Sequence, residues 1–503
     1  MQLETVRDYI NFNSKNYPDT NFVTCPHTEI KISNKNLKIN LDKLNYYLTV
    51  QKEQKIGSLI CTLTENSLSG IQLMLGIMYS GMIQVPLNLV AGEDQLAYII
   101  EHSGSKILFS TKSNVELAKK IIKKSKCEID LIEIDKDNFV NKLDNQKKDL
   151  VGINKSSNCL LMYTSGTTGK PKGVMLTHDN VLSGGKNVMD SHKLTSSDIA
   201  MCVLPLYHIN GLIVTVMGPL VSQSLIVLSE KFSATNFWKH IEKYNCTWFS
   251  IVPTIVSSLL NKYSENKTVN YNLSSIRFGR SASAALAPET HKNFEKKFKI
   301  KLIETMGLTE TCAPILSNPL SPNQIKYGSP GIPYGNEVCI VNDKYEQVER
   351  NIIGQICVRG KNVMKEYFKN PQETKKSFYK DWFLTGDLGL MDDENFIFVK
   401  GRIKELIIKG GENISPREID DILYQHPNIL EAAAFGVACD HYGEKIEAGV
   451  VLKTKGITSE EEILNHCKNL LGNFKSPSKI HFFKELPKGS SGKIQRLKIS
   501  ELI

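Results

Sequence analysis

The 503-residue sequence lacks the features that mark membrane, secreted and zinc-binding proteins. It contains no run of about 20 apolar residues, which a membrane-spanning helix would need. Its most apolar window, residues 203–228, is interrupted by proline, glycine and polar residues and predicts a buried strand–helix–strand passage. Residues 1–17 carry charges with no apolar run behind them, unlike a signal peptide. The eleven cysteines form no Cys-x-x-Cys pair, which argues against a zinc ribbon or a disulfide framework. We therefore expect a soluble, cytoplasmic protein with reduced thiols and no transmembrane segment.

The sequence also has little excess charge. Its 62 Lys and Arg residues exceed its 53 Asp and Glu residues to give a net charge of +9, and the basic residues are scattered. Nucleic-acid binding would need them clustered on one face, so we expect no nucleic-acid partner. With 41% hydrophobic and 23% charged residues, the composition is that of an ordinary globular protein. The length predicts about three structural units.

Short apolar runs alternate with amphipathic stretches over most of the chain. Strands are predicted over residues 59–63, 83–87, 107–110, 200–204, 224–228 and 248–252, with helices such as 68–79 between them. This alternation predicts an α/β fold with doubly wound, mixed sheets. After about Asn336, strands joined by short polar turns predict a β-rich subdomain. We expect a large N-terminal domain over residues 1–401 and a small α+β C-terminal domain over residues 402–503.

The richest local signal is a loop between two strand-like runs in residues 160–178. Its members are Thr164, Ser165, Gly166, Thr167, Thr168, Gly169, Lys170 and Lys172. Glycines let backbone N–H groups turn toward one point, while hydroxyls and lysines add donors and charge, so the loop suits a polyphosphate. It is no Walker loop, because Pro171 stands where a hydroxyl and a helix start should be. The alternative is a glycine-rich hairpin turn with solvated lysines.

This loop resembles the phosphate-binding signature of the adenylate-forming superfamily, which includes acyl-CoA synthetases, carrier-loading adenylation domains and firefly-type luciferases. Other segments resemble that superfamily's motifs in the same order. They are residues 79–88, Pro205–His208, Glu304–Glu310, Thr385–Asp387, Gly401–Lys404, Lys409–Asn413 and Pro487–Arg496. One match would be weak, whereas this series covers nearly the whole chain. The resemblance implies an AMP-forming acyl-CoA synthetase with a mobile C-terminal domain.

The resemblance also implies the nucleotide contacts. Asp387 would accept hydrogen bonds from both ribose hydroxyls, a bidentate task suited to a carboxylate, and Arg402 would support the same ribose. An ordinary turn aspartate and a surface arginine are the alternatives. The other ATP- and AMP-binding residues would be Ser283, Ala284, Thr305 and Met306. The superfamily usually has an aromatic residue in place of Met306, which can pack on a purine through its sulfur but with weaker stacking.

Three residues would carry the chemistry of adenylation. Glu310 would hold Mg²⁺, which prefers carboxylate oxygens, and Thr309 would bind the α-phosphate of ATP; a helix-capping pair is the alternative. Lys493, in a Gly/Ser-rich loop, would bridge the substrate carboxylate and the α-phosphate. The carboxylate attacks the α-phosphorus, pyrophosphate leaves, and a thiol then expels AMP.

These two steps need different groups at one carbon, so the C-terminal domain would rotate about Lys404 between them. A solvated strand-end lysine is the alternative for this residue. Rotation would bring the CoA-side residues Lys409, Gly410, Gly411 and Glu412 to a pantetheine tunnel. The expected cofactors are ATP and Mg²⁺, with coenzyme A as co-substrate. A ligase that loads a carrier protein and a non-catalytic nucleotide-binding protein remain as alternatives.

The acyl pocket is the least defined site. Its candidate walls are His208, Asn210, Ser250, Arg280 and Ser281. These polar and charged side chains are unlike a fatty-acid tunnel. Residues 248–254 and 278–284 are similar to the branch that includes oxalate-activating ligases. We therefore expect a small or medium carboxylate as the substrate.

Overall fold

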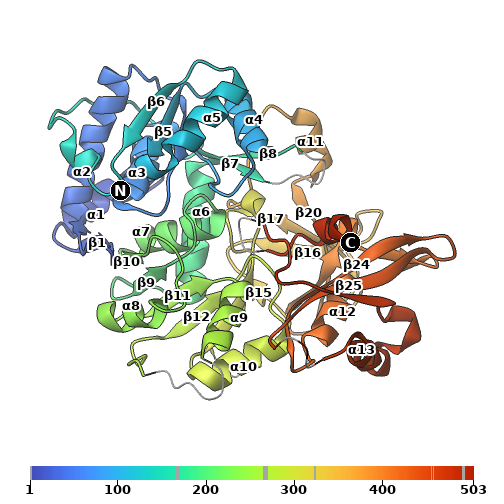
Figure 1. The fold of residues 1–503 in the computed structure, drawn as a ribbon. Helices are drawn as coiled ribbons and strands as arrows, with labels where there is room; N and C mark the ends of the chain where they lie inside the picture. The colour runs from blue at the N-terminus through green and yellow to red at the C-terminus, as the bar shows by residue number, and fades with distance from the viewer. Residues whose placement is uncertain are drawn as a thin grey trace.

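The structure, a computed structural model, describes residues 3–164, 170–263, 270–321, 324–454, 456, 458–489 and 493–503. Much of the predicted phosphate loop, namely Ser165, Gly166, Thr167, Thr168 and Gly169, lies outside these described residues. The chain forms four β-sheets, two in a large α/β body, one in a β-rich subdomain and one in the C-terminal domain (Figure 1).

The first large sheet has seven strands and is built mainly from the first third of the chain. In spatial order they are β18 (Glu366–Tyr367), β8 (Lys172–Thr177), β7 (Asn158–Thr164), β4 (Ile83–Pro86), β3 (Leu59–Leu63), β5 (Ile107–Thr111) and β6 (Asp130–Ile134). Strands β7 to β6 are parallel, while β8 and β18 are antiparallel additions. One face packs on α4 (Glu93–Ser103) and α5 (Val115–Ser125), and the other on α2 (Asn34–Tyr46) and α3 (Leu68–Tyr79).

The second large sheet has nine strands. Their order is β15 (Ile332–Pro333), β14 (Leu316–Ser317), β13 (Leu302–Met306), β12 (Phe278–Ser281), β11 (Trp248–Ile251), β9 (Ile199–Cys202), β10 (Leu225–Leu228), β1 (Asn21–Thr24) and β2 (Lys31–Ser33). The outer face packs on α8 (Phe237–Tyr244), α9 (Pro253–Lys262) and α10 (Pro288–Phe298). The inner face packs on α1 (Val6–Asn16), α6 (His178–His192), α7 (Gly218–Ser222) and the π-helix η4 (Asn210–Met217).

A single hydrophobic core joins the two large sheets. It contains Met74 of α3, Leu160 of β7, Val181 of α6 and Trp248 of β11, so the helices between the sheets are buried on both sides. The body is therefore layered as helices, sheet, helices, sheet and helices, the doubly wound arrangement expected from the sequence. The passage 203–228 is buried as predicted but contains only the helices η4 and α7 and the strand β10, since the preceding strand β9 already ends at Cys202.

The β-rich subdomain is an antiparallel sheet. Its strands are β16 (Glu337–Val341), β17 (Gly354–Arg359), β20 (Trp382–Met391), β19 (Phe378–Tyr379) and β21 (Ile397–Arg402), with α11 (Pro371–Lys376) inserted before β19. This confirms the β-rich subdomain that the sequence predicts after about Asn336.

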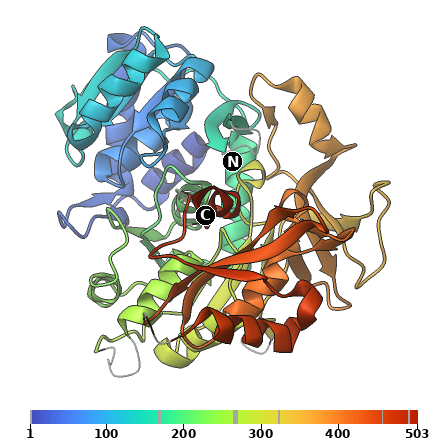
Figure 2. The same cartoon turned by 45° about the vertical axis from the view of Figure 1, so that its right-hand side comes forward.

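The C-terminal domain has a sheet and a core of its own. Its strands are β23 (Glu412–Ile414), β22 (Ile407–Lys409), β25 (Gly443–Leu452), β24 (Ile429–Cys439) and β26 (Lys479–Phe482). Helices α12 (Pro416–Leu423) and α13 (Glu460–Lys475) pack on one face, and residues near α14 (Arg496–Ile499) on the other. Figure 2 shows this domain beside the β-rich subdomain. The predicted fold class is confirmed.

Candidate active site

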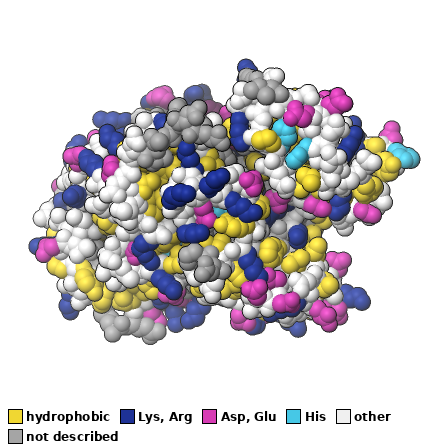
Figure 3. Space-filling model, turned by 90° about the horizontal axis from the view of Figure 1, so that it is seen from below, with side chains coloured by type: hydrophobic (Ala, Val, Ile, Leu, Met, Phe, Trp, Pro, Cys, Tyr) yellow, Lys and Arg dark blue, Asp and Glu magenta, His cyan; other side chains and the backbone are white. Residues whose placement is uncertain are grey.

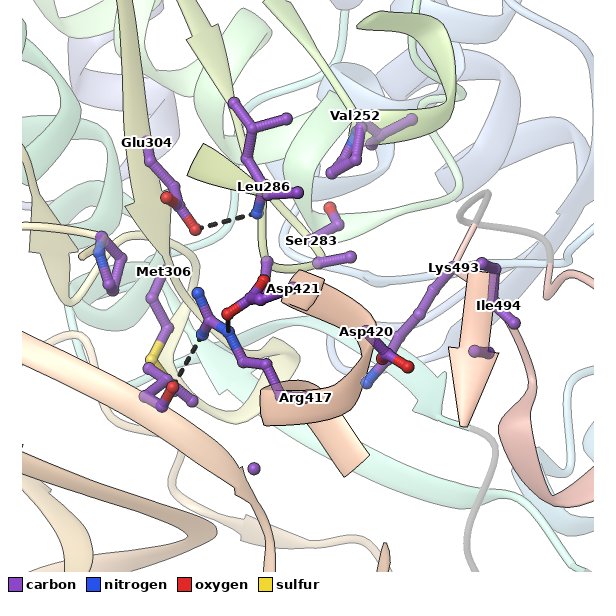
Figure 4. A pocket seen from close by; sticks show the side chains of 18 of the residues that line it. Val252, Ser283, Leu286, Glu304, Met306, Arg417, Asp420, Asp421, Lys493 and Ile494 are labelled. Atoms are coloured by element: carbon purple, nitrogen blue, oxygen red, sulfur yellow. Dashed lines mark hydrogen bonds and ion pairs between the residues drawn. The ribbon is translucent and has the colours of Figure 1, made fainter. Parts of the chain in front are cut away.

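A cavity of about 220 Å³ lies between the large body and the C-terminal domain (Figure 4). The body contributes Ser283, Ala284, Thr305, Met306 and Asp387 among others, Arg402 ends β21 at the boundary, and the C-terminal domain contributes Glu405, Arg417, Asp420, Asp421, Lys493 and Arg496. Ser283 follows β12 and Met306 ends β13, so the cavity sits outside the carboxyl ends of parallel strands, where open α/β sheets bind ligands. Six of the fourteen predicted nucleotide residues and the predicted catalytic lysine therefore line one cavity.

Asp387 and Arg402 form the polar centre of this cavity. They are paired across β20 and β21, and Arg402 Nε lies 2.9 Å from Asp387 Oδ1. A bulge within β20 just before Asp387 uses Gly386 at φ +73°, a left-handed conformation that favours glycine. Thr385 fixes this bulge, since its hydroxyl accepts the Asp387 N–H at 3.0 Å and donates to the Ile356 carbonyl at 2.7 Å. Burial raises the pKa of Asp387, while Arg402 and Lys493 oppose that rise.

Lys493 reaches the same cavity from the C-terminal domain (Figure 4). The Gly489 N–H donates to the Lys493 carbonyl at 2.7 Å, which holds the two ends of this segment together. Burial lowers the pKa of the Lys493 ammonium, and the nearby charge of Arg402 lowers it further. Glu405 and Asp387 act in the opposite direction. A lysine ammonium held in a cavity beside a carboxylate can stabilise the negative charge that develops on a bound phosphate.

Two residues of the cavity wall are unusual: Ser283 in its backbone conformation and Glu304 in the burial of its carboxylate. Ser283 has φ +72°, which is rare for a residue other than glycine and is typical of functional sites. Its hydroxyl accepts a hydrogen bond from Asn210 Nδ2 at 3.0 Å. Glu304 is 2% exposed; one carboxylate oxygen accepts the Leu286 N–H at 3.1 Å, and the other is buried without a partner. Burial raises the pKa of Glu304, opposed by Arg417.

Arg417 bridges the two domains at this wall, a contact that the sequence did not predict. From α12 it donates to the carbonyls of Val399 at 2.8 Å and Gly328 at 3.2 Å, both in the large body. Its Nε lies 3.8 Å from Asp421 on the next helical turn. Arg417 and Asp421 stand four residues apart in a predicted helix, a spacing that allows an ion pair. This spacing was the sequence signal that could have drawn attention to Arg417. Nothing in the sequence indicated that this helix meets β21 of the body.

Thr309 and Glu310 begin the short 3₁₀-helix η5 (Thr309–Thr311), just beyond the cavity wall. Glu310 Oε1 accepts a hydrogen bond from the Tyr367 hydroxyl at 2.8 Å, and its charge acts on Arg402. Tyr367 also faces Lys172, whose ammonium lies 5.3 Å from the ring centroid. Tyr367 thus links the predicted metal-binding carboxylate to the described end of the phosphate loop.

The other described members of the phosphate loop lie at its two stems. Thr164 and Lys172 are opposite each other in the β7–β8 pair. Lys172 forms an ion pair with Glu373, and the Lys170 ammonium lies 5.5 Å from the Tyr98 ring centroid. Lys and Arg side chains gather near the middle of the face shown in Figure 3, between its lobes.

Three of the predicted acyl-pocket residues form a buried cluster behind Ser283. Arg280 is 1% exposed and donates to Asn210 Oδ1 at 2.7 Å and to Ser250 Oγ at 2.8 Å. Since Asn210 also donates to Ser283, a polar chain runs from Arg280 to the cavity wall. Ser281 is buried on β12, and His208 lies beside the Tyr207 ring just before η4. These residues surround the cavity wall but do not line the cavity itself.

The predicted CoA-side residues lie away from the cavity. Lys409 ends β22, Glu412 begins β23, and Gly410 and Gly411 form the turn between them. The Lys409 ammonium bonds to the Phe474 carbonyl and lies 4.8 Å from the Phe474 ring centroid. Lys404 lies in the 3₁₀-helix η7 (Ile403–Glu405), between β21 and the C-terminal sheet.

Comparison with known proteins identifies the family. A model of the AMP-binding enzyme family matches residues 11–368, and a model of the C-terminal domain of AMP-binding enzymes matches residues 418–493. The chain belongs to the AMP-binding enzyme family. A sulfoacetate–CoA ligase from Cupriavidus necator is 40% identical over 448 residues, 88% of this chain and 87% of that protein. An oxalate–CoA ligase from Arabidopsis thaliana is 36% identical over 453 residues, 88% of each chain.

Solved structures of this family have the same fold. ATP-bound MatB from Rhodopseudomonas palustris superposes with a TM-score of 0.91 at 27% identity, covering 100% of this chain and 99% of that one. The o-succinylbenzoate CoA synthetase of Bacillus subtilis, in complex with its acyl-adenylate, gives 0.86 at 27% identity and covers 98% and 97%. This AMP-binding enzyme is thus an ATP-binding, AMP-forming acid–CoA ligase that activates a carboxylate through an acyl-adenylate, as the sequence predicts. None of its described helices is long and apolar enough to cross a membrane.

Proposed function

We propose that this AMP-binding enzyme activates a small carboxylic acid that carries a second anionic group, and transfers it to coenzyme A. The buried guanidinium of Arg280 is the observation that carries this proposal. Its two hydrogen-bond acceptors, Asn210 and Ser250, are neutral, and its Nε is buried without a partner. No described carboxylate forms an ion pair with it. Burial lowers the pKa of Arg280 to about 9, so the group is still a cation at neutral pH.

A buried cation without a counter-ion is costly, and a bound anion would offset that cost. Arg280 lies behind Ser283, which lines the nucleotide cavity, so an acid whose reacting carboxylate lies near Lys493 could direct its second group toward Arg280. The relatives named above support this class, because sulfoacetate and oxalate are both small acids with two acidic groups. A hydrophobic acyl chain would leave the guanidinium uncompensated.

For the nucleotide, we propose that Asp387 binds the ribose hydroxyls with Arg402 beside it, and that Ser283, Ala284, Thr305 and Met306 enclose the adenine. Lys493 would stabilise charge at the α-phosphate during attack by the substrate carboxylate, together with Thr309. The phosphate loop from Thr164 to Lys172 would hold the departing pyrophosphate. The convergence of the first seven of these residues on one cavity supports these roles.

Mg²⁺ belongs to the proposal through Glu310. No described group of three or more His, Cys, Asp or Glu side chains could hold a metal ion, so Glu310 would act with at most one other such side chain. This fits Mg²⁺, which often uses one or two carboxylates together with substrate phosphate oxygens. The ion would neutralise phosphate charge when ATP binds. The hydrogen bond from Tyr367 would orient the Glu310 carboxylate toward it.

The second half-reaction completes the proposal. The division into domains at residues 401 and 402 places Lys404 just inside the C-terminal domain, where rotation would carry Lys493 away from the acyl carbon. The same rotation would bring Lys409, Gly410, Gly411 and Glu412 to the thiol side. These residues are remote from the cavity in the observed orientation, which agrees with an arrangement for adenylate formation.

The test is pyrophosphate exchange across a panel of acids, with oxalate, sulfoacetate and malonate compared with acetate, butyrate and palmitate. We expect the acids with a second anionic group to give the highest kcat/KM. Arg280→Met should lower kcat/KM for those acids much more than for acetate. The matched control is Arg277→Met, since Arg277 immediately precedes β12 but is partly exposed and already paired with the carboxylate of Asp198. Highest efficiency with palmitate, or an equal loss on all acids in Arg280→Met, would contradict the proposal. Replacing CoA with a phosphopantetheine-bearing carrier protein identifies the thiol acceptor.

A further inference from the structure

Two cysteines of the β-rich subdomain lie directly opposite each other. Cys339 on β16 is paired with Cys357 on β17 in an antiparallel ladder, and the two side chains belong to the same small hydrophobic cluster. The Cys357 thiol donates to the Gln355 carbonyl of its own strand at 3.8 Å. This pair has no part in the ligase mechanism described above.

The spacing of the two backbones suits a disulfide. Residues directly opposite in an antiparallel pair have Cα atoms about 4.5 or 5.5 Å apart, depending on whether they exchange backbone hydrogen bonds. A disulfide spans Cα distances of about 4.4–6.8 Å. Both ladder positions fall inside that range, so the thiols could join without moving either strand.

The pair lies on the face of β17 that is turned away from the nucleotide cavity. Successive side chains of a strand point to opposite faces. Ile356 and Val358 pack in the core cluster that also contacts Met306, whereas Cys357 belongs to the cluster with Val341 and the partly buried Trp382 and Leu384. Cys339 is 7% exposed and Cys357 1% exposed, with Trp382 and Leu384 partly buried beside them, so Cys339 is the thiol that a small oxidant would reach first.

The remaining cysteines differ from this pair. All eleven are free thiols, and for most of those outside the pair burial raises the pKa, so that they stay protonated and unreactive. Cys339 is different, because the neighbouring Cys357 thiol lowers its pKa and the nearby Arg359 acts in the same direction. Cys439 also has a lowered pKa but has no cysteine opposite it in the β24–β25 ladder, where its partner is Gly443.

We propose that Cys339 and Cys357 are a redox modification site at which a hydroperoxide converts the two thiols to an intramolecular disulfide. The Cys339 thiolate attacks the peroxide O–O bond, giving a sulfenic acid and releasing water or an alcohol. Cys357 sulfur then attacks the sulfenic sulfur, the S–O bond breaks, and the hydroxyl leaves as water with the Cys357 proton. The peroxide is reduced by two electrons and the two thiols are oxidised by two. The resulting cross-link joins β16 to β17 and spares Cys339 from irreversible oxidation.

The test is oxidation of the full chain with increasing hydrogen peroxide, followed by denaturing alkylation of the remaining thiols and tryptic mass spectrometry. Cleavage after Lys326, Lys344, Arg350 and Arg359 places the two cysteines in peptides 327–344 and 351–359. We expect these peptides to become cross-linked before any other cysteine is oxidised, and dithiothreitol to separate them. ATP binding, measured by calorimetry, should be the same before and after oxidation, because the pair is on the far face of β17.

The variants identify the order of attack. Cys357→Ser should stop at a Cys339 sulfenic acid that dimedone traps, and Cys339→Ser should leave Cys357 as a thiol. Cys439→Ser is the matched control and should form the cross-link as the parent does. Three results would overturn the proposal: oxidation of Cys439 before the pair, over-oxidation of Cys339 without the cross-link, or a cross-link only between different molecules. The first measurement uses the unaltered protein, so it holds even if a variant fails to fold.

Discussion

Arg417→Ala should separate the two half-reactions of this ligase. The Arg417 guanidinium makes two hydrogen bonds from the C-terminal domain to carbonyls of the large body, at 2.8 and 3.2 Å, beside the buried Glu304. A hydrogen bond to a charged group contributes about 1.5–3 kcal/mol, so losing two disfavours the observed domain orientation by roughly 3 kcal/mol. That is about a hundredfold in the equilibrium between orientations, at about 1.4 kcal/mol for each factor of ten. Adenylate formation, which uses this orientation, should slow by up to that factor.

The assay measures both steps on the same preparation: pyrophosphate exchange for the first, and thioester formation from chemically made acyl-adenylate and CoA for the second. Exchange should fall in Arg417→Ala while thioester formation is kept, because in the proposed mechanism the second step uses the rotated domain. Lys475→Ala is the control, since it breaks an ion pair with Glu418 at 2.8 Å that lies wholly within the C-terminal domain. Equal losses in both steps, or the same split in the control, would refute this role for Arg417.

Asp387→Ala should weaken ATP binding by about 2–4 kcal/mol, the scale of two charge-assisted hydrogen bonds, and unchanged affinity in a calorimetric titration of the folded variant would count against the ribose role. Lys493→Ala should lower pyrophosphate exchange by about 10²–10⁴ and keep thioester formation. Lys404→Pro should do the reverse, because proline fixes the backbone at the hinge: exchange should be kept and thioester formation blocked. Pyrophosphate exchange and thioester formation are both measured for each variant, and an equal loss in the two steps would exclude domain rotation. Burial raises the pKa of Asp421 to about 6. Because the folded chain then holds a proton that the unfolded chain releases, the stability from this group falls as pH rises from about 4 to 6. Asp421→Asn should therefore raise the thermal midpoint at pH 8 and leave it unchanged near pH 4, as scanning calorimetry at both pH values would show.

The regular elements of the fold followed from local patterns. Residues 59–63 and 68–79 are a strand and a helix with the predicted bounds, because continuous apolar runs and helical spacing are local signals. Other elements are displaced by a residue or more: the strand expected at 200–204 is β9, Ile199–Cys202. Its position is set by pairing with β10 and β11, which a local pattern does not encode. Pairing also adds β18 to the seven-stranded sheet from a distant part of the chain.

The site was predictable where a motif marks it and not elsewhere. Asp387, Arg402 and Lys493 stand in recognisable segments, and the cavity brings them together. Arg417 and Glu304 were missed, since their importance depends on how one domain lies against the other. The acyl-pocket candidates Asn210, Ser250 and Arg280 do cluster, but behind the cavity wall rather than in it. Side-chain direction along β11 and β12 decides this, and the sequence alone leaves the depth of each residue undefined.

The C-terminal domain has a hydrophobic core separate from those of the body, while the contacts across the boundary described above are largely polar. Two cores joined by polar contacts are two cooperative melting units, so heating the free enzyme should give two overlapping transitions rather than one. An acyl-adenylate that touches Asp387 on one side and Lys493 on the other binds only when both units are folded and docked. Ligand would then merge the two transitions into one at higher temperature, and the shape of a melting curve would report how the two units are coupled.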